Sequence, residues 1–220
     1  MTFKHALLCA SLTLPMAAPA WAAEPFDYDY LGITYDYQRI GADGFSEEFA
    51  GHKVAVIYSE ELRQGLVYQA FADTEFVDDD LVNGGDKIVY ERDAISLGAS
   101  LGVHLPVTAK ADFVSTAKLG YSFFDTYERR SMSGSSSEVT TDGSEAYIDL
   151  SAGVRWFIDA HNSLDFQPLV GAIVTEDNTD TYLRGRASFR LVNAMEVYVD
   201  MTTYLDSDFR AFGTGMFMYY

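Results

Sequence analysis

The feature that most constrains the fold of this chain is an alternation of apolar residues with polar or small ones. It is clearest over residues 146–158, where every second side chain is apolar: Ala146, Ile148, Leu150, Ala152, Val154, Trp156 and Ile158. Successive side chains of a β-strand point to opposite faces of the sheet, so this pattern predicts a strand with one apolar face. Residues 95–105, 182–191 and 196–205 repeat it, and no stretch after Glu24 has helical periodicity. The body of the chain is therefore predicted to be all-β.

The alternation predicts ten strands. Their expected limits are 28–39, 51–60, 65–76, 87–104, 110–127, 144–158, 164–175, 181–192, 195–205 and 209–220. The connections alternate in character. One set is polar, acidic or rich in Gly and Ser: 41–50, 77–86, 128–143 and 176–180. The other set is shorter: 61–64, 105–109, 159–163 and 192–194. Long acidic outer loops opposite short periplasmic turns are typical of an antiparallel up-and-down transmembrane β-barrel. Eight strands are the alternative, if 51–60 and 65–76 form an extended hairpin.

The polarity of the two strand faces separates a membrane barrel from a soluble one. A soluble barrel is apolar inside, whereas an outer-membrane barrel is apolar outside and polar inside. The polar faces of this chain carry many Gly and Ser residues, which suit a narrow lumen, and they carry charges in mid-strand: Lys118, Asp149, Arg155, Arg186 and Asp200. These features favour the membrane barrel, with a soluble periplasmic β-protein as the alternative.

Aromatic residues cluster near the predicted strand ends, which indicates two belts at the membrane interfaces. The belt near the short turns would contain Tyr28, Tyr30, Trp156, Phe157, Phe166, Tyr219 and Tyr220. The belt near the long loops would contain Tyr37, Phe76, Phe123, Phe124, Tyr127, Tyr147, Tyr182 and Tyr204.

Residues 1–22 are typical of a cleaved secretory signal peptide. Lys4 and His5 precede the apolar stretch 6–16, and residues 20–22 (AWA) supply the small-x-small pattern that signal peptidase recognises. Cys9 does not indicate a lipoprotein, because Leu8 stands where a small residue is required. Residues 23–220 are then expected to form a single outer-membrane barrel domain.

Composition limits the partners of the chain. It has 33 Asp and Glu against 15 Lys and Arg, for a formal net charge of −18. Nucleic acid is excluded as a partner, because phosphate contacts need clustered basic residues. The single Cys excludes a disulfide scaffold and a Cys-based zinc module. The sequence carries no cofactor signature, so we expect none.

The chain ends in an alternating apolar strand with a terminal aromatic residue. This end resembles the carboxy-terminal strand signal of outer-membrane barrels, which implies that the barrel-insertion machinery reads Phe212, Met216, Met218 and Tyr220. With the opening residues 26–35 (FDYDYLGITY), the whole of 23–220 resembles the small outer-membrane β-barrel proteins of Gram-negative bacteria, such as OmpA-like and porin-family barrels. The resemblance implies a monomer in the bacterial outer membrane, in contact with its lipids and lipopolysaccharide.

The lumen of so small a barrel is filled mainly by side chains. The charges predicted to face it have both signs: Lys118, Asp149, Arg155, Arg184, Arg186, Arg190, Glu196 and Asp200. The arginines of strand 181–192 lie next to the strand of Glu196 and Asp200, so cross-strand ion pairs can form. We therefore expect a structural envelope barrel with a lumen largely plugged by salt bridges. A narrow porin-like channel for ions or small solutes is the alternative.

No convincing catalytic constellation is present, so the protein is not expected to be an enzyme. His104 and His161 fall near the short turns, whereas the catalytic groups of barrel enzymes lie at the outer rim. His52 falls near that rim, beside Glu47 and Glu48, and such a pair is common by chance. An outer-membrane hydrolase is therefore the third function considered.

No metal site is predicted. Asp78, Asp79 and Asp80 are weak candidates for binding a hard divalent cation through carboxylate oxygens. Their spacing is not that of an EF-hand, and a solvated acidic rim is the favoured interpretation.

Overall fold

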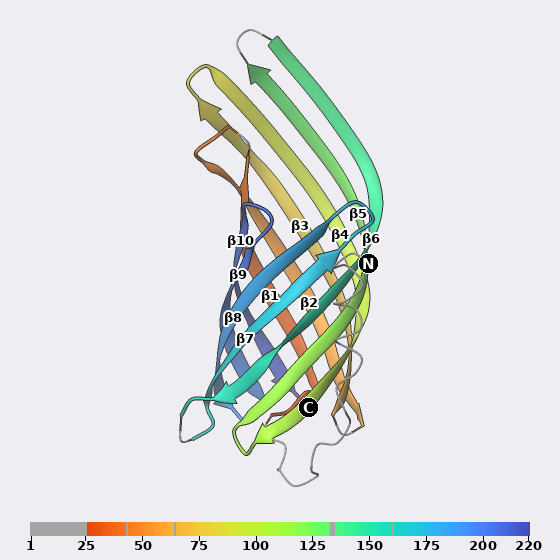
Figure 1. Ribbon diagram of the computed structural model, residues 1–220, viewed down its shortest axis with the longest axis vertical. Helices are drawn as coiled ribbons and strands as arrows, with labels where there is room; N and C mark the ends of the chain where they lie inside the picture. Colours follow the sequence, from red (N-terminus) through yellow and green to blue (C-terminus); the bar gives the residue numbers. More distant parts are fainter. Residues whose placement is uncertain (1–25, 43, 64, 133–134, 160) are drawn as a thin grey trace, which may run out of the picture.

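The computed structural model describes residues 26–220 apart from 43, 64, 133–134 and 160, so the expected signal peptide lies outside the described residues. The described residues form ten antiparallel strands: β1 Tyr30–Gly41, β2 Glu48–Arg63, β3 Leu66–Asn83, β4 Asp86–Thr108, β5 Ala111–Met132, β6 Ser135–Phe157, β7 Leu164–Val174, β8 Thr179–Val192, β9 Met195–Tyr204 and β10 Phe209–Tyr219. Strands consecutive in the chain pair with each other, and β1 pairs with β10 to close the barrel (Figure 1). The prediction of an all-β barrel with ten strands is confirmed, and the alternative of eight is excluded. Within the described part of the chain, no helix is long and apolar enough to cross a membrane.

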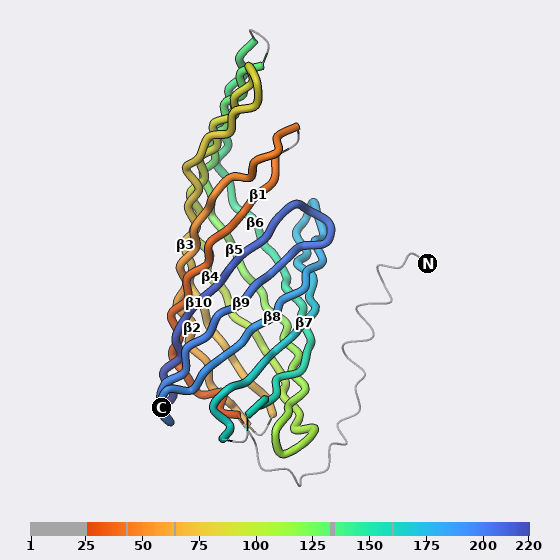
Figure 2. The backbone as a smooth tube through the Cα atoms, turned by 90° about the vertical axis from the view of Figure 1, so that its left-hand side faces the viewer, coloured from red at the N-terminus to blue at the C-terminus, as the bar shows by residue number. Residues whose placement is uncertain are grey.

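The two ends of the barrel differ. The connections β2–β3, β4–β5, β6–β7 and β8–β9 lie at the end where the chain terminates, which we call the short-turn end (Figure 1). The remaining connections lie at the opposite end, which we call the hairpin end. There the β3–β4 and β5–β6 hairpins reach well beyond β7 to β10 (Figures 1 and 2).

The prediction of long loops at 77–86 and 128–143 is wrong. β3 continues to Asn83 and β4 starts at Asp86, and β5 pairs with β6 outward as far as Met132 and Ser135. These segments are polar, but every backbone group facing the neighbouring strand can still pair, and the run 139–141 (VTT) favours an extended backbone. Polarity shows only that the segments are solvated. It does not end the strands.

The barrel wall is polar inside and apolar outside. On β9 the inward Glu196 and Asp200 are buried, whereas the outward Val199 and Met201 are 61% and 46% exposed. The same alternation holds around the barrel, where exposed outward residues include Ile33, Val56, Leu97, Leu119, Ile148, Val170, Leu183 and Phe212. This inverted polarity is the arrangement of a transmembrane barrel.

The predicted aromatic belts are only partly correct. The outward strand faces carry Tyr37, Phe76, Phe123 and Tyr127 near the hairpin end, and Trp156, Phe166 and Tyr220 near the short-turn end. The other rings point into the lumen: Tyr28, Tyr30, Phe124, Tyr147, Phe157, Tyr182, Tyr204 and Tyr219. The position of a residue along its strand determines its depth in the membrane. Because side chains alternate between the two faces of a strand, a shift of one residue decides whether the ring points to the lumen or to the lipid.

Glycines make room for some of these inward rings. The ring of Tyr147 on β6 lies over Gly120 on β5, and the ring of Tyr182 on β8 lies over Gly171 on β7. A Cβ atom at either glycine would overlap ring atoms. The small residues of the polar strand faces therefore allow large side chains to fill a narrow lumen.

Replacing Gly120 by alanine is expected to lower the free energy of unfolding by about 1–3 kcal/mol, because the new methyl group overlaps the Tyr147 ring. The measurement is the urea midpoint of the barrel in micelles. Gly85→Ala is the matched control, since a Cβ atom there meets nothing within 4 Å. Equal midpoints for the two variants would contradict this account.

The hairpin end has an apolar cluster of its own, which the sequence analysis did not predict. Phe49, Val77, Leu81 and Ile88 are buried together. Phe45 of the β1–β2 connection packs against them. The β1–β2 connection is thereby held against the inward face of the β3–β4 hairpin.

Candidate functional site in the barrel lumen

All eight predicted lumen charges lie on the inward face of their strands: Lys118, Asp149, Arg155, Arg184, Arg186, Arg190, Glu196 and Asp200. The register places Lys118 opposite Asp149, Arg186 opposite Asp200, and Arg190 opposite Glu196. Arg184 lies opposite Thr202, which is uncharged. These pairings do not all become ion pairs, and the lumen divides into two regions.

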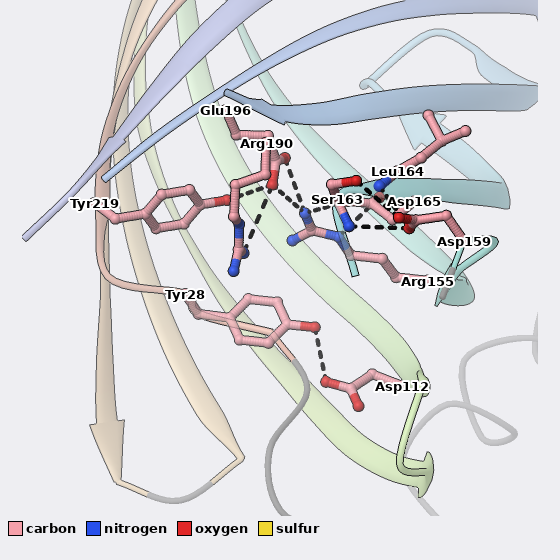
Figure 3. A network of polar contacts seen from close by, with 10 residues as sticks. All are labelled: Tyr28, Asp112, Arg155, Asp159, Ser163, Leu164, Asp165, Arg190, Glu196 and Tyr219. Carbon is pink, nitrogen blue, oxygen red and sulfur yellow. Dashed lines mark hydrogen bonds and ion pairs between the residues drawn. The ribbon is translucent and has the colours of Figure 1, made fainter. Parts of the chain in front are cut away.

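The first region is a buried ionic network near the short-turn end, centred on Arg155 (Figure 3). Arg155 donates from Nε to Asp165 Oδ1 at 3.0 Å and from Nη2 to Asp165 Oδ2 at 2.8 Å. Its Nη2 also donates to both carboxylate oxygens of Glu196 at 2.8 Å. All three side chains are less than a tenth exposed. One guanidinium therefore binds two buried carboxylates, which come from β7 and β9.

Two further side chains complete this network. Tyr219 of β10 donates its hydroxyl to Glu196 Oε2 at 2.9 Å. Arg190 of β8 lies 3.9 Å from the same oxygen, a looser ion pair. The network thus joins every strand from β6 to β10. The sequence analysis missed two of its members, Asp165 and Tyr219. Asp165 alternates with the polar Gln167, which is the signal that could have identified it.

The residues before β1 fold into the lumen beside this network. The ring of Phe26 stacks on Phe157 with centroids 4.3 Å apart, and the Arg155 guanidinium lies 4.4 Å from the Phe26 centroid. Tyr28 stacks on His104. Its hydroxyl donates a hydrogen bond to Asp112 at 3.1 Å (Figure 3). β1 begins at Tyr30, two residues after the expected start at residue 28. The rings of Phe26 and Tyr28, which precede the strand, lie inside the lumen at the short-turn end.

His104 lies in the same region of the lumen, against Tyr28. Its ring is 1% exposed, with Glu61 at 3.3 Å from Nε2 and Asp112 at 3.3 Å from Nδ1. A buried imidazole between two carboxylates belongs to the polar filling of the lumen.

The second region lies further toward the hairpin end and contains separate ion pairs. Arg186 contacts Asp200 at 3.2 Å and lies over the Tyr198 ring at 4.0 Å. Lys53 pairs with Asp73 at 3.1 Å, and Arg92 pairs with Glu75 at 3.2 Å. Each of these ion pairs joins two neighbouring strands: β8 and β9, β2 and β3, or β3 and β4.

Lys118 and Arg184 have no such partner. Lys118 Nζ lies 3.8 Å from the centroid of Phe71, and Arg184 Nε donates to Thr202 Oγ1 at 3.0 Å. Asp149, opposite Lys118 in register, instead accepts a hydrogen bond from the Tyr182 hydroxyl at 2.8 Å. Within the described residues, neither base has a carboxylate at ion-pair distance.

Two cavities meet at these residues. One, of about 330 Å³, extends toward the hairpin end, and the other, of about 230 Å³, extends toward the short-turn end. Lys118, Asp149 and Arg184 line both cavities. They form the neck between the outer cavity and the inner cavity, which Tyr28 also lines.

The structure does not bring the candidate metal ligands together. Asp78, Asp79 and Asp80 lie in β3, so consecutive side chains point to opposite faces. Asp79 accepts from the backbone N–H of Ala50, and Asp80 pairs with Lys87 at 2.8 Å. In the part of the chain that the structure describes, no group of three or more His, Cys, Asp or Glu side chains is arranged to hold a metal ion.

His52 faces outward from β2 and belongs to an aromatic cluster. Its Nδ1 lies 2.7 Å from the Tyr35 hydroxyl, and its ring packs against Tyr37 and Phe76. Glu47 and Glu48 are not among these contacts. His161 lies exposed in the β6–β7 turn.

The four residues of the proposed insertion signal lie on the outward face of β10 and just after it. Phe212 and Met218 are exposed and Met216 is half-buried. Tyr220 stacks on Tyr58 and donates its hydroxyl to the carbonyl of Ser59 at 3.1 Å. Tyr220 thereby reaches past β1, which lies between β10 and β2, and contacts β2 directly.

The β6–β7 turn is organised by Asp159, which lies outside the strands. Its carboxylate accepts backbone N–H bonds from Leu164 and Ser163, both at 2.9 Å, and from His161 at 3.1 Å. These hydrogen bonds, chiefly the one from Leu164, hold the pKa of Asp159 well below its usual value.

Replacing Asp159 by alanine is expected to destabilise the barrel at neutral pH. Because the folded-state pKa is lowered, the contribution of Asp159 is complete above its unfolded pKa of about 3.9 and is lost as the pH falls further. Urea midpoints at a series of pH values should show a gap between wild type and variant that narrows below about pH 4. Asp177→Ala, in the exposed β7–β8 turn, is the control. A gap that is constant with pH would contradict the assigned role.

Comparison with known proteins assigns the fold but no family. No family model matches the chain, and no curated protein matches it. Among solved structures, the transport unit of the autotransporter AIDA-I from Escherichia coli has 8% identity and a TM-score of 0.55, and the match covers 99% of this chain and 97% of that one. The translocator domain of autotransporter NalP from Neisseria meningitidis has 9% identity and a TM-score of 0.53, with 99% and 94% covered. At such identities the likeness shows the fold alone, which is that of the outer-membrane β-barrels.

Proposed function

We propose that this protein is an integral barrel of the bacterial outer membrane with a structural role in the envelope, closed at its periplasmic end. The apolar outer wall supports residence in a membrane, and short turns face the periplasm in such barrels. The observation that carries the closed state is the Arg155 network together with the plug of residues 26–28. Removing Arg155 would leave the buried Asp165 without a base at ion-pair distance in the described structure, so the network depends on this residue.

The partners that fit this role are those of the membrane. Lipid acyl chains would cover the apolar band, and lipopolysaccharide would surround the hairpin end, where Arg129 is an exposed base able to meet phosphate. The alternating end of β10 fits recognition by the barrel-insertion machinery during assembly. We infer a monomer, because the closed barrel leaves no unpaired strand edge in the membrane-spanning wall.

We also infer that the protein is not an enzyme. The candidate base at the outer rim, His52, is hydrogen-bonded to Tyr35 and packed among aromatic rings on the lipid-facing side. A base so placed is not directed at a water-filled pocket where a substrate could bind.

A narrow channel is the second candidate function. It is favoured by Lys118 and Arg184, which have no carboxylate partner in the described lumen, and by the two cavities that meet between them. Charges of this kind around a water path select ions in channels. Conduction would require the plug of residues 26–28 to move.

The deciding measurement is single-channel conductance of the refolded protein in a planar bilayer. We expect no steady conductance from protein whose heat-modifiable gel mobility shows that it is folded. A reproducible conductance that changes in Arg184→Ala but not in Arg129→Ala would favour the channel over the closed barrel. Loss of heat-modifiable mobility in the wild type would contradict the membrane barrel itself.

A further inference from the structure

The bases of the lumen are not equivalent. Five of them lie near carboxylates: Lys53, Arg92, Arg155, Arg186 and Arg190. Lys118 and Arg184 alone, among the lumen bases that the structure describes, have no carboxylate within ion-pair distance. Both are only partly exposed, and both line the outer cavity. Partly desolvated cations with no carboxylate in contact are unfavourable, and a bound anionic group would offset that cost.

The geometry of Arg184 suits a carboxylate. Its Nε is occupied by Thr202, which fixes the plane of the guanidinium and leaves Nη1 and Nη2 without acceptors in the described structure. Paired N–H groups of this kind match the two oxygens of a carboxylate. Lys118, held over the ring of Phe71, adds a second positive charge at the same neck.

The same cavity holds a carboxylate of its own without a partner. Asp36 of β1 lines the cavity, and its carboxylate, like that of Asp200, lies next to Gly213 of β10. Asp200 is neutralised by Arg186, but Asp36 makes no ion pair or side-chain hydrogen bond within the described residues. Tyr147 and Tyr204 also line the cavity, and Lys118 Nζ lies 5.5 Å from the centroid of the Tyr147 ring.

Access to this site is from the hairpin end. The lining of the cavity includes Thr175, Asp180 and Ser207, which belong to the β7–β8 and β9–β10 ends of the wall. Its volume of about 330 Å³ is at the small end of the range for ligand pockets. The occupant is therefore a small molecule that enters from outside.

We propose that the outer cavity binds a small zwitterion of the amino-acid type, with its carboxylate on Arg184 and Lys118 and its ammonium group at Asp36. A simple anion would meet Asp36 and Asp149, and a simple cation would meet the two bases. Only a molecule that carries both charges satisfies both sets of groups. The site does not depend on conduction, so it can exist in a barrel that stays closed.

The test is calorimetric titration of the folded wild-type barrel in micelles. The zwitterionic probes are glycine, β-alanine and γ-aminobutyrate, which differ in the separation of their charges. Acetate and methylammonium each carry one of the two charges. We expect saturable binding of at least one zwitterion, and binding of acetate and methylammonium that is weaker by about tenfold or more. No saturable binding of any zwitterion, or acetate binding as tightly as the best of them, would overturn the proposal.

Variants locate the site. Arg184→Lys keeps the charge but removes the paired N–H groups, and Asp36→Asn removes the acidic group with little change of shape. Each is expected to weaken zwitterion binding by about tenfold, while Arg190→Lys, the same exchange outside both cavities, leaves it unchanged. Heat-modifiable mobility confirms that each variant is folded. Wild-type affinity in both folded site variants, or equal weakening in Arg190→Lys, would overturn the assignment of these residues.

Discussion

Arg155→Leu is expected to lower the free energy of unfolding by on the order of 3 kcal/mol. The substitution removes the only base within hydrogen-bonding distance of Asp165 in the described structure. It leaves Glu196 with the Tyr219 hydroxyl and the looser contact to Arg190. Both carboxylates are almost completely buried, so neither can recover its lost interactions from bulk water. The measurement is the urea midpoint of the refolded barrel in micelles.

Two further variants make this result specific to the network. Arg129→Leu makes the same exchange at an exposed position of β5 and should change stability little. The combined variant Arg155→Leu, Asp165→Asn, Glu196→Gln should recover part of the loss, because the buried negative charges are removed together with the guanidinium. An unchanged midpoint in Arg155→Leu would show that the network does not stabilise the closed barrel.

Deletion of Tyr220 is expected to lower the amount of folded protein in the outer membrane several-fold. The terminal aromatic residue completes the alternating pattern of β10, which resembles the strand end that the insertion machinery reads. Tyr220 also stacks on Tyr58 and bonds to the Ser59 carbonyl, so its loss frees the end of the strand that closes the barrel against β1. The measurement is the heat-modifiable band in isolated outer membranes.

Tyr220→Phe separates the two contributions of this residue. It keeps the terminal ring but loses the hydrogen bond to Ser59, and it should reach the membrane at close to the wild-type level. Wild-type amounts of the deletion variant would refute the insertion signal. An equal loss in Tyr220→Phe would assign the effect to the hydrogen bond instead.

Strand limits were most accurate at the short-turn end. β9 was expected at 195–205 and spans Met195–Tyr204, and β7 was expected at 164–175 and spans Leu164–Val174. At the hairpin end the expectation failed for β3 to β6, because solvated strands lack the apolar residues by which alternation is recognised. The segment 135–143 contains Val139 as its one large apolar residue, too few to show alternation, and its strand character comes from pairing with β5.

Within the lumen, register alone was a good guide to proximity but not to bonding. Arg186 and Asp200 face each other and form an ion pair, whereas Lys118 and Asp149 face each other and do not. Asp149 is bonded to Tyr182, a residue expected in the aromatic belt that instead points inward. The side chains that compete for a charge come from several strands around the lumen, and a pattern along one strand contains no information about them.

The sequence by itself determined that the chain is an all-β barrel of ten strands, charged inside and apolar outside. The alternation of apolar and polar side chains is a local property, which can be read within each strand independently of the others. Only the tertiary structure decided which charges are paired, that Phe26 and Tyr28 enter the lumen at one end, and that Lys118 and Arg184 line a cavity without a carboxylate in contact. These outcomes depend on distances across the lumen. Some of the residues concerned, such as Phe26 and Phe157, are more than a hundred positions apart in the chain, and they come together only when the barrel closes.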